Sequence, residues 1–143
     1  MKIKTQKQGR FAGNTLAGNH PSMASQLLSL REAAMRAAQA ATMTETCTRV
    51  RTTRVADGAG SFTDGATTTA ALACRVASAG MPQEYMQMAV ARARRPIMIT
   101  VPFGSDVLHT DTITYGGKTH EILGFVSAGQ WATALRCACV EVS

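Results

Sequence analysis

The sequence predicts a mainly β protein: a small antiparallel β-barrel or sandwich with one N-terminal α-helix, a basic N-terminal arm and a long inter-strand loop. The most informative region is 97–143, where several strand-like stretches surround a single Gly-Gly turn. Gly116 and Gly117 favour a two-residue hairpin, because both central residues of such a turn need positive φ. No strand–helix–strand pattern accompanies these stretches. A chain of 143 residues is about one domain, large enough to bury roughly two thirds of its unfolded surface.

Residues 1–22 are expected to form a flexible basic arm. They contain no acidic residue, and Lys2, Lys4, Lys7 and Arg10 supply four of the net six positive charges of the chain. Such a segment is more often a solvated arm than a folded element. Its alternative role is electrostatic attachment to nucleic acid or to an acidic protein surface.

Residues 23–43 are expected to contain the N-terminal helix. The apolar positions lie on one helical stripe, and charged residues occupy other faces, as an amphipathic helix requires. The stripe consists of Leu27, Leu30, Ala34, Ala37 and Ala41. Because most of its members are alanine, a neighbouring element can approach the helix closely.

Residues 44–143 are expected to form the β-domain. The expected strands cover 44–55, 67–77, 97–101, 111–115, 118–126 and 131–142. Residues 57–60, Asp-Gly-Ala-Gly, turn the first strand back onto the second. On the last strand Leu135, Cys137 and Cys139 share one face, which predicts a buried face.

An inserted loop is expected at 80–95, between two strands. Pro82 could open a short helix there, since proline is tolerated at the first helical position. Arg92, Arg94 and Arg95 form a second basic group at the end of this segment. The group is either a solvated loop end or a surface that faces DNA phosphates or an acidic partner. Long insertions in small barrels are usually functional or mobile.

The residues that could carry chemistry do not form a recognisable catalytic, metal or cofactor site. Residues 117–119, Gly-Lys-Thr, lack the earlier glycine and the following helix of a phosphate-binding loop. Asp106, His109 and Asp111 could be a ligand set, but the simpler interpretation is a polar loop whose aspartates accept backbone hydrogen bonds. The four cysteines are expected to be buried thiols. We expect no enzyme activity and no cofactor.

No membrane association is expected either. The first residues lack the apolar stretch of a secretory signal, and no window approaches the roughly 18 apolar residues that a spanning helix needs.

Several short motifs, in order and spacing, resemble those of a known family. They are Val101-Pro102-Phe103-Gly104-Ser105-Asp106-Val107, Asp111-Thr112-Ile113, Gly117-Lys118-Thr119-His120-Glu121-Ile122-Leu123-Gly124 and Ala132-Thr133-Ala134-Leu135-Arg136, with weaker matches at 46–48, 57–60 and 74–76. Together they resemble the tailed-bacteriophage head closure proteins, also called stoppers or head-tail joining proteins. The resemblance covers about residues 44–143. His120 and Ser105 depart mildly from the pattern, where an aromatic residue and Thr are usual.

The resemblance implies a structural protein of the virion neck, at the head-tail interface, assembled in the host cytoplasm. Such proteins form a homo-oligomeric ring of six or twelve copies below the portal or adaptor, close the channel around packaged double-stranded DNA, and offer a docking surface to the tail terminator or tail tube. The candidate channel loop is 80–95, with Gln83, Glu84, Arg92, Arg94 and Arg95 as the residues that face DNA, and the candidate interface arm carries Lys2, Lys4, Lys7 and Arg10. The alternatives are another neck or tail component, a tail terminator or adaptor, or a small-barrel nucleic-acid-binding protein.

Overall fold

The computed structural model describes residues 22–78, 80–92, 94–126 and 132–142, so the expected arm lies almost entirely outside the described residues. Two helices and six strands make up the described chain. They are α1 (Met23–Ala41), β1 (Glu45–Ala56), β2 (Phe62–Ala77), α2 (Gln83–Ala91), β3 (Pro96–Pro102), β4 (Thr112–Tyr115), β5 (Lys118–Val126) and β6 (Ala134–Val142).

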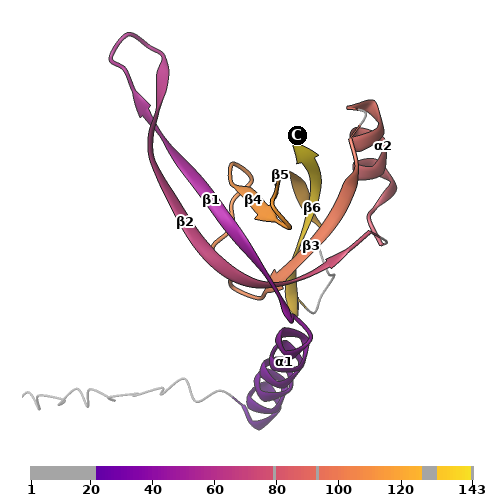
Figure 1. Cartoon of the computed structure of the whole chain (residues 1–143). Helices are drawn as coiled ribbons and strands as arrows, with labels where there is room; N and C mark the ends of the chain where they lie inside the picture. The colour runs from indigo at the N-terminus through magenta and orange to yellow at the C-terminus, as the bar shows by residue number, and fades with distance from the viewer. Residues whose placement is uncertain (1–21, 79, 93, 127–131, 143) are drawn as a thin grey trace, which may run out of the picture.

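The strands form one antiparallel sheet that closes on itself in the order β1-β2-β3-β6-β5-β4 (Figure 1). Closure depends on β1, which pairs with β2 along its whole length and with β4 over only three residues, Thr48–Val50. The mainly β, antiparallel fold with an N-terminal helix is therefore confirmed. β2 starts at Phe62, five residues before the expected strand, because its pairing with β1 continues almost to the turn.

The core of the barrel is small and rich in sulfur and branched side chains. Its buried members are Cys47, Cys74, Ile99, Val101, Val107, Ile113, Ile122, Cys137 and Cys139. Leu135 packs against this cluster, so the expected inward face of the last strand is confirmed. Burial raises the pKa of Cys137 to about 12, and Cys47, Cys74 and Cys139 also have raised pKa values. The thiols therefore stay protonated and act as small apolar groups.

Two tight turns match the sequence expectation. Gly116 and Gly117 connect β4 to β5 with φ values of 58° and 76°, the left-handed backbone that a primed hairpin turn requires. Between β1 and β2, the Asp57 carboxylate accepts hydrogen bonds from the Ala59 and Ser61 amides at 2.8 and 3.0 Å. This side chain therefore fixes the reversal of the chain.

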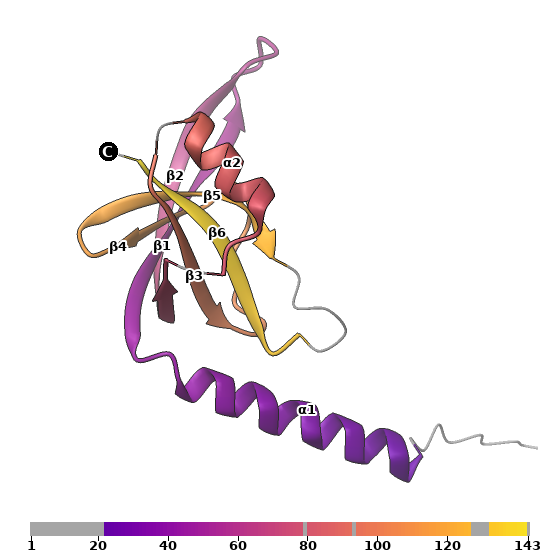
Figure 2. The same ribbon diagram turned by 90° about the vertical axis from the view of Figure 1, so that its right-hand side faces the viewer.

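α1 is capped by Ser22, whose hydroxyl accepts a hydrogen bond from the Ser25 amide at 3.2 Å. It ends at Ala41, the last residue of the expected apolar stripe, and the chain then leads into β1. The helix lies below the barrel and extends away from it (Figure 2). Arg36 provides its main attachment, because its Nε donates to the Ala132 carbonyl at 3.2 Å and its guanidinium lies 3.7 Å from the ring centroid of Phe103.

α2 occupies most of the segment 80–95, in line with the short helix that Pro82 suggested. Pro82 is the residue that caps it rather than its first helical residue. The helix packs on the outside of the barrel through Ala89, which is fully buried, and through Tyr85. A Cβ added at Gly124 would lie only 2.5 to 2.7 Å from Tyr85 ring and hydroxyl atoms. A side chain at this position of β5 would therefore force the Tyr85 ring to move.

Substituting valine for Gly116 or Gly117 should destabilise the domain. A β-branched residue resists positive φ, so each variant should lose on the order of 1 kcal/mol or more of unfolding free energy. Urea unfolding followed by circular dichroism measures the change. Thr119→Val, at an exposed position of the same hairpin, is the matched control and should unfold near the wild-type midpoint. If both glycine variants unfold at the same urea midpoint as the wild type and the control, the turn does not need its glycines.

Candidate functional site

The most prominent feature outside the barrel is a two-stranded ribbon formed by residues 51–68, the distal parts of β1 and β2. β4 leaves β1 after Val50, and β3 pairs with β2 only at Arg75–Ala77, so within the described residues the ribbon strands pair only with each other. Figure 1 shows the ribbon rising away from the barrel. At about 3.4 Å per residue, its tip lies roughly 20 Å beyond Arg51.

The ribbon exposes both polar and apolar side chains. Val55 and Phe62 are 53 and 63% exposed near the tip, and five of the other ribbon residues are exposed threonines. Gly65 sits at a register shift between the two strands, where an added Cβ would lie 2.7 Å from Val55 Cγ2. A β-bulge of this kind increases local twist. Because an isolated two-stranded hairpin is only marginally stable in water, the ribbon depends on what holds its base.

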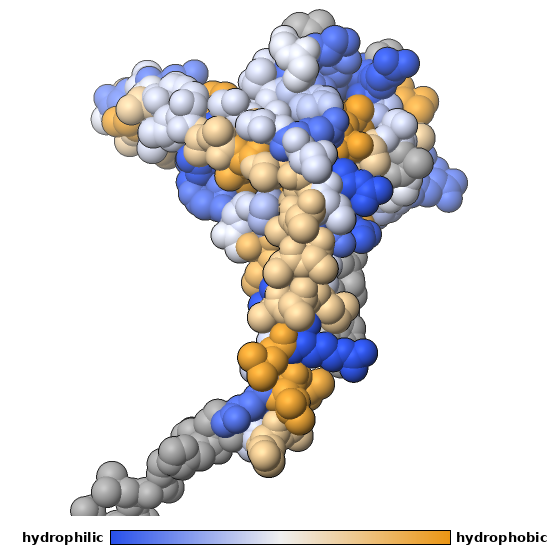
Figure 3. Space-filling view, turned by 60° about the horizontal axis from the view of Figure 1, so that its bottom comes forward, coloured by the Kyte–Doolittle hydropathy of each residue, from blue (hydrophilic) through white to orange (hydrophobic). Residues whose placement is uncertain are grey.

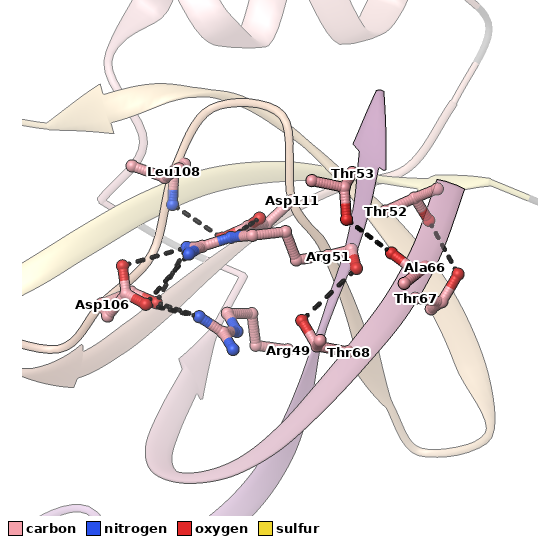
Figure 4. Close-up of polar contacts among 10 residues, drawn as sticks. All are labelled: Arg49, Arg51, Thr52, Thr53, Ala66, Thr67, Thr68, Asp106, Leu108 and Asp111. Atoms are coloured by element: carbon pink, nitrogen blue, oxygen red, sulfur yellow. Dashed lines mark hydrogen bonds and ion pairs between the residues drawn. The ribbon is translucent and has the colours of Figure 1, made fainter. Parts of the chain in front are cut away.

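The base of the ribbon is held by an ion-pair network, the arginine clamp, made by Arg49, Arg51, Asp106 and Asp111 (Figure 4). Arg49 and Arg51 alternate along β1 and so project from the same face. Arg51 binds Asp111 through two hydrogen bonds, Nε to Oδ1 at 2.7 Å and Nη2 to Oδ2 at 2.8 Å. It also reaches both Asp106 carboxylate oxygens at 3.0 Å, and Arg49 Nη1 donates to Asp106 Oδ2 at 2.7 Å. Two arginines thereby fix the β3–β4 loop against β1.

The clamp continues the pairing of β1 with β4, which is the seam that closes the barrel. Val50 and Thr112 are the last paired residues of β1 and β4, and Arg51 and Asp111 are their immediate neighbours. The Asp111 side chain is fully buried and also accepts the Leu108 amide at 2.8 Å. Where strand pairing stops, a bidentate ion pair therefore takes over.

The electrostatics favour the charged forms of Asp111, Asp106 and Arg51. Burial alone would raise the pKa of Asp111, but hydrogen bonds from Arg51 and from the Leu108 amide outweigh it and lower the pKa. A hydrogen bond from Arg51 is the main cause that lowers the pKa of Asp106. The same bonds raise the pKa of Arg51. Arg49 Nε is buried without a hydrogen-bond partner among the described residues, so the network is not saturated.

The ion-pair network itself was not predicted from the sequence, although its two aspartates were singled out. The sequence predicted that the two aspartates accept backbone hydrogen bonds, which the Leu108 amide confirms for Asp111. It did not predict the arginines, which lie 55 to 60 residues earlier in the chain. Their alternate spacing on a predicted strand was the available signal. His109 does not join the carboxylates: its ring makes an edge contact with Phe125, with centroids 4.4 Å apart.

The candidate residues of segment 80–95 lie on or beside α2. Gln83 and Glu84 are exposed in the first turn of α2. Arg92 pairs with Glu121 of β5 at 3.1 Å, and Arg94 Nη1 donates to the Glu141 carbonyl of β6 at 3.1 Å. Arg95 is exposed, and its carbonyl accepts the Glu141 amide. The structure thus brings two of the three arginines onto the barrel wall.

The other candidates lie elsewhere. Lys2, Lys4, Lys7 and Arg10 fall outside the described residues. Among the residues that the structure describes, no group of three or more His, Cys, Asp or Glu side chains could hold a metal ion. The described helices include none that is long and apolar enough to cross a membrane.

Comparison with known proteins decides which family this barrel represents. Residues 38–142, about three quarters of the chain, match the family described as phage head completion protein. The chain belongs to this family. No curated protein matches the sequence. The match includes the whole barrel, the ribbon and α2, whereas most of α1 precedes it.

Family membership gives this head completion protein a structural role in a bacteriophage particle. Proteins of the family are structural rather than enzymatic, they act at the phage head, and they contact other head and tail proteins.

Asp111→Asn tests the clamp. The variant keeps the shape of the side chain but removes the charge opposite Arg51, so it should lose about 2 kcal/mol or more of unfolding free energy at pH 7. The pKa values of Asp111 and Asp106 are lowered in the folded protein, so their contribution is present above the unfolded value of about 4 and is lost as the pH falls through the folded values. Wild-type stability should therefore drop on acidification below about pH 4, and the variant should drop less.

Urea titrations at pH 7 and pH 3 provide the measurement. Asp64→Asn, on the exposed ribbon and outside the clamp, should behave like wild type at both values. Equal pH dependence in wild type and Asp111→Asn would contradict the assigned role of the ion pair.

Proposed function

We propose that this chain forms a ring in the neck of the particle, below the portal or adaptor, where it closes the channel around packaged DNA and offers a docking surface to the tail. The ring would contain six or twelve copies, with the tail terminator or tail tube below it. The observation that supports this function best is the ribbon, which extends roughly 20 Å from a rigid closed barrel and is anchored by the arginine clamp.

A ring of barrels can close a channel only if each copy extends something toward the axis. The ribbon suits this task, because its base is fixed while its tip, with Val55 and Phe62 exposed, pairs with no other strand of the described chain. Exposed apolar tips that converge could bury one another. The ribbon carries Arg51, Arg54, Asp57 and Asp64, so charges of both signs are balanced and its barrier to DNA would be steric.

Segment 80–95 remains the second candidate for contact with DNA. Its basic side chains could gain from counterion release beside a duplex without reading its sequence. However, Tyr85, Arg92 and Arg94 attach it to the barrel, so it is less free than the ribbon to reach an axis. We therefore assign the steric gate to the ribbon and a supporting electrostatic role to Arg92, Arg94 and Arg95.

Shortening the ribbon tests the gate. Thr52 and Thr67 are direct partners, so residues 53–66 can be replaced by Asn-Gly, which forms a two-residue hairpin turn. The barrel should remain folded because the core and the clamp lie below the cut. Heads that carry this variant should bind it but lose packaged DNA, measured as nuclease-protected DNA per particle before tail attachment. Full DNA retention, with the variant shown to be present on heads, would exclude the ribbon as the gate.

Replacing Arg92, Arg94 and Arg95 together with Gln tests the electrostatic role. Heads with this variant should retain DNA at low salt and lose part of it as salt is raised, since the remaining phosphate contacts are screened. Arg54→Gln, a single charge removed from the ribbon, is the matched control and should retain DNA at all salt concentrations. If heads with the triple variant lose much of their DNA while heads with the shortened ribbon retain all of it, the gate is segment 80–95 and not the ribbon.

A further inference from the structure

α1 directs its apolar stripe away from the barrel. None of its residues is buried, and the largest members of the stripe, Met23, Leu27 and Leu30, are 84, 66 and 67% exposed. Figure 3 shows an apolar surface that runs along the part of the molecule below the barrel. Soluble helices normally turn such a stripe toward a core.

The side of α1 that meets the barrel is instead polar. The half-buried residues of the helix are Glu32, Arg36, Gln39 and Ala40, and Arg36 makes the contacts with Ala132 and Phe103. At 100° per residue this side is nearly opposite the stripe. Glu32 and Arg36 also pair with each other at 3.5 Å, on the same side. The barrel therefore cannot cover the stripe without detaching the helix.

The order of side-chain sizes along the stripe indicates what can cover it. Met23, Leu27 and Leu30 occupy the N-terminal half, and exposed alanines occupy the C-terminal half at 34, 37 and 41. In an antiparallel pair of two α1 helices centred near residue 32, Met23 faces Ala41, Leu27 faces Ala37 and Leu30 faces Ala34 of the second copy. Every large side chain then meets a small one. A parallel pair would place leucine against leucine at one end and leave alanine against alanine at the other.

We propose that two copies of this protein pair in solution through antiparallel α1 helices. Each barrel lies on the side of its helix opposite the stripe, so both barrels remain outside the pair and do not collide. The contact is two-fold symmetric, whereas a ring is built from heterologous contacts, so this pairing is distinct from ring formation and goes beyond the proposed function. It covers the apolar stripe of copies that are not yet on a head.

The pairing should be weak. A helix of 19 residues is about 28 Å long, and two such stripes bury roughly 1,000 Å² in total, the lower limit for specific interfaces. We therefore expect a concentration-dependent dimer in the micromolar range. Arg31 of both copies lies at the same edge of the contact, where the two positive charges repel each other. Added salt screens this repulsion, so it should not weaken the pair.

Sedimentation equilibrium of the full-length protein over 1 to 200 µM tests this proposal. Wild type should change from monomer to dimer across this roughly 200-fold range, and Leu27→Glu with Leu30→Glu should stay monomeric. Leu28→Glu with Met35→Glu places the same two charges on exposed positions off the stripe, and this control should dimerise like wild type. A circular dichroism melt checks that each variant is folded. A wild-type monomer at 200 µM, or equal loss of dimer in both double variants, would overturn the proposal.

Disulfide trapping tests the register. The four native cysteines are buried, so an introduced surface cysteine reacts alone. Mixing Leu30→Cys protein with Ala34→Cys protein under mild oxidation should yield mainly the mixed disulfide, because these positions face each other. Predominant disulfides within each single variant would indicate parallel pairing and contradict the antiparallel contact. Neither experiment involves heads, so failure here leaves the channel proposal standing.

Discussion

The fold depends on one short seam. β1 and β4 share only three residue pairs, and without them the sheet would be open, with β1 pairing with β2 alone. The Arg51–Asp111 ion pair begins where this pairing stops, and Arg49 and Asp106 extend it into the β3–β4 loop. A buried carboxylate is costly unless it is paired and hydrogen-bonded, and Asp111 meets both conditions. The seam therefore combines closure of the barrel with fixation of the ribbon.

This arrangement separates a rigid part from an extended part. The barrel core is buried and apolar, whereas the ribbon has exposed edges, a bulge at Gly65 and apolar groups at its tip. Stability is not uniform across a protein, and elements that contact partners are drawn from the less stable regions. A clamp at the base lets a marginal ribbon keep a defined direction while its tip stays available for other molecules. The two helices show the same contrast. α2 packs on the barrel wall, whereas α1 exposes its apolar stripe to solvent.

Much of the fold could be predicted from local sequence rules. The Gly116-Gly117 turn, the Asp57 turn and the alternating strands depend on residues close in the chain, and the structure confirms them. The extension of β2 to Phe62 could not be predicted, because threonines and Gly65 carry a weak strand signal and the pairing partner decides the boundary. The arginine partners of Asp106 and Asp111 were missed for a related reason: their contact spans 55 to 60 residues and exists only after the barrel closes. The outward direction of the α1 stripe was equally hidden, since an amphipathic pattern does not say which face meets the protein.

We propose above that copies of this chain form a ring whose ribbons meet on the channel axis. A reconstruction of DNA-filled heads before tail attachment tests it most directly. We expect a ring of barrels below the portal or adaptor, with the ribbon tips, residues 57–61, converging on the axis beneath the last DNA density. Ribbons that point to the outside of the particle, or a ring whose axis is blocked by segment 80–95, would contradict it.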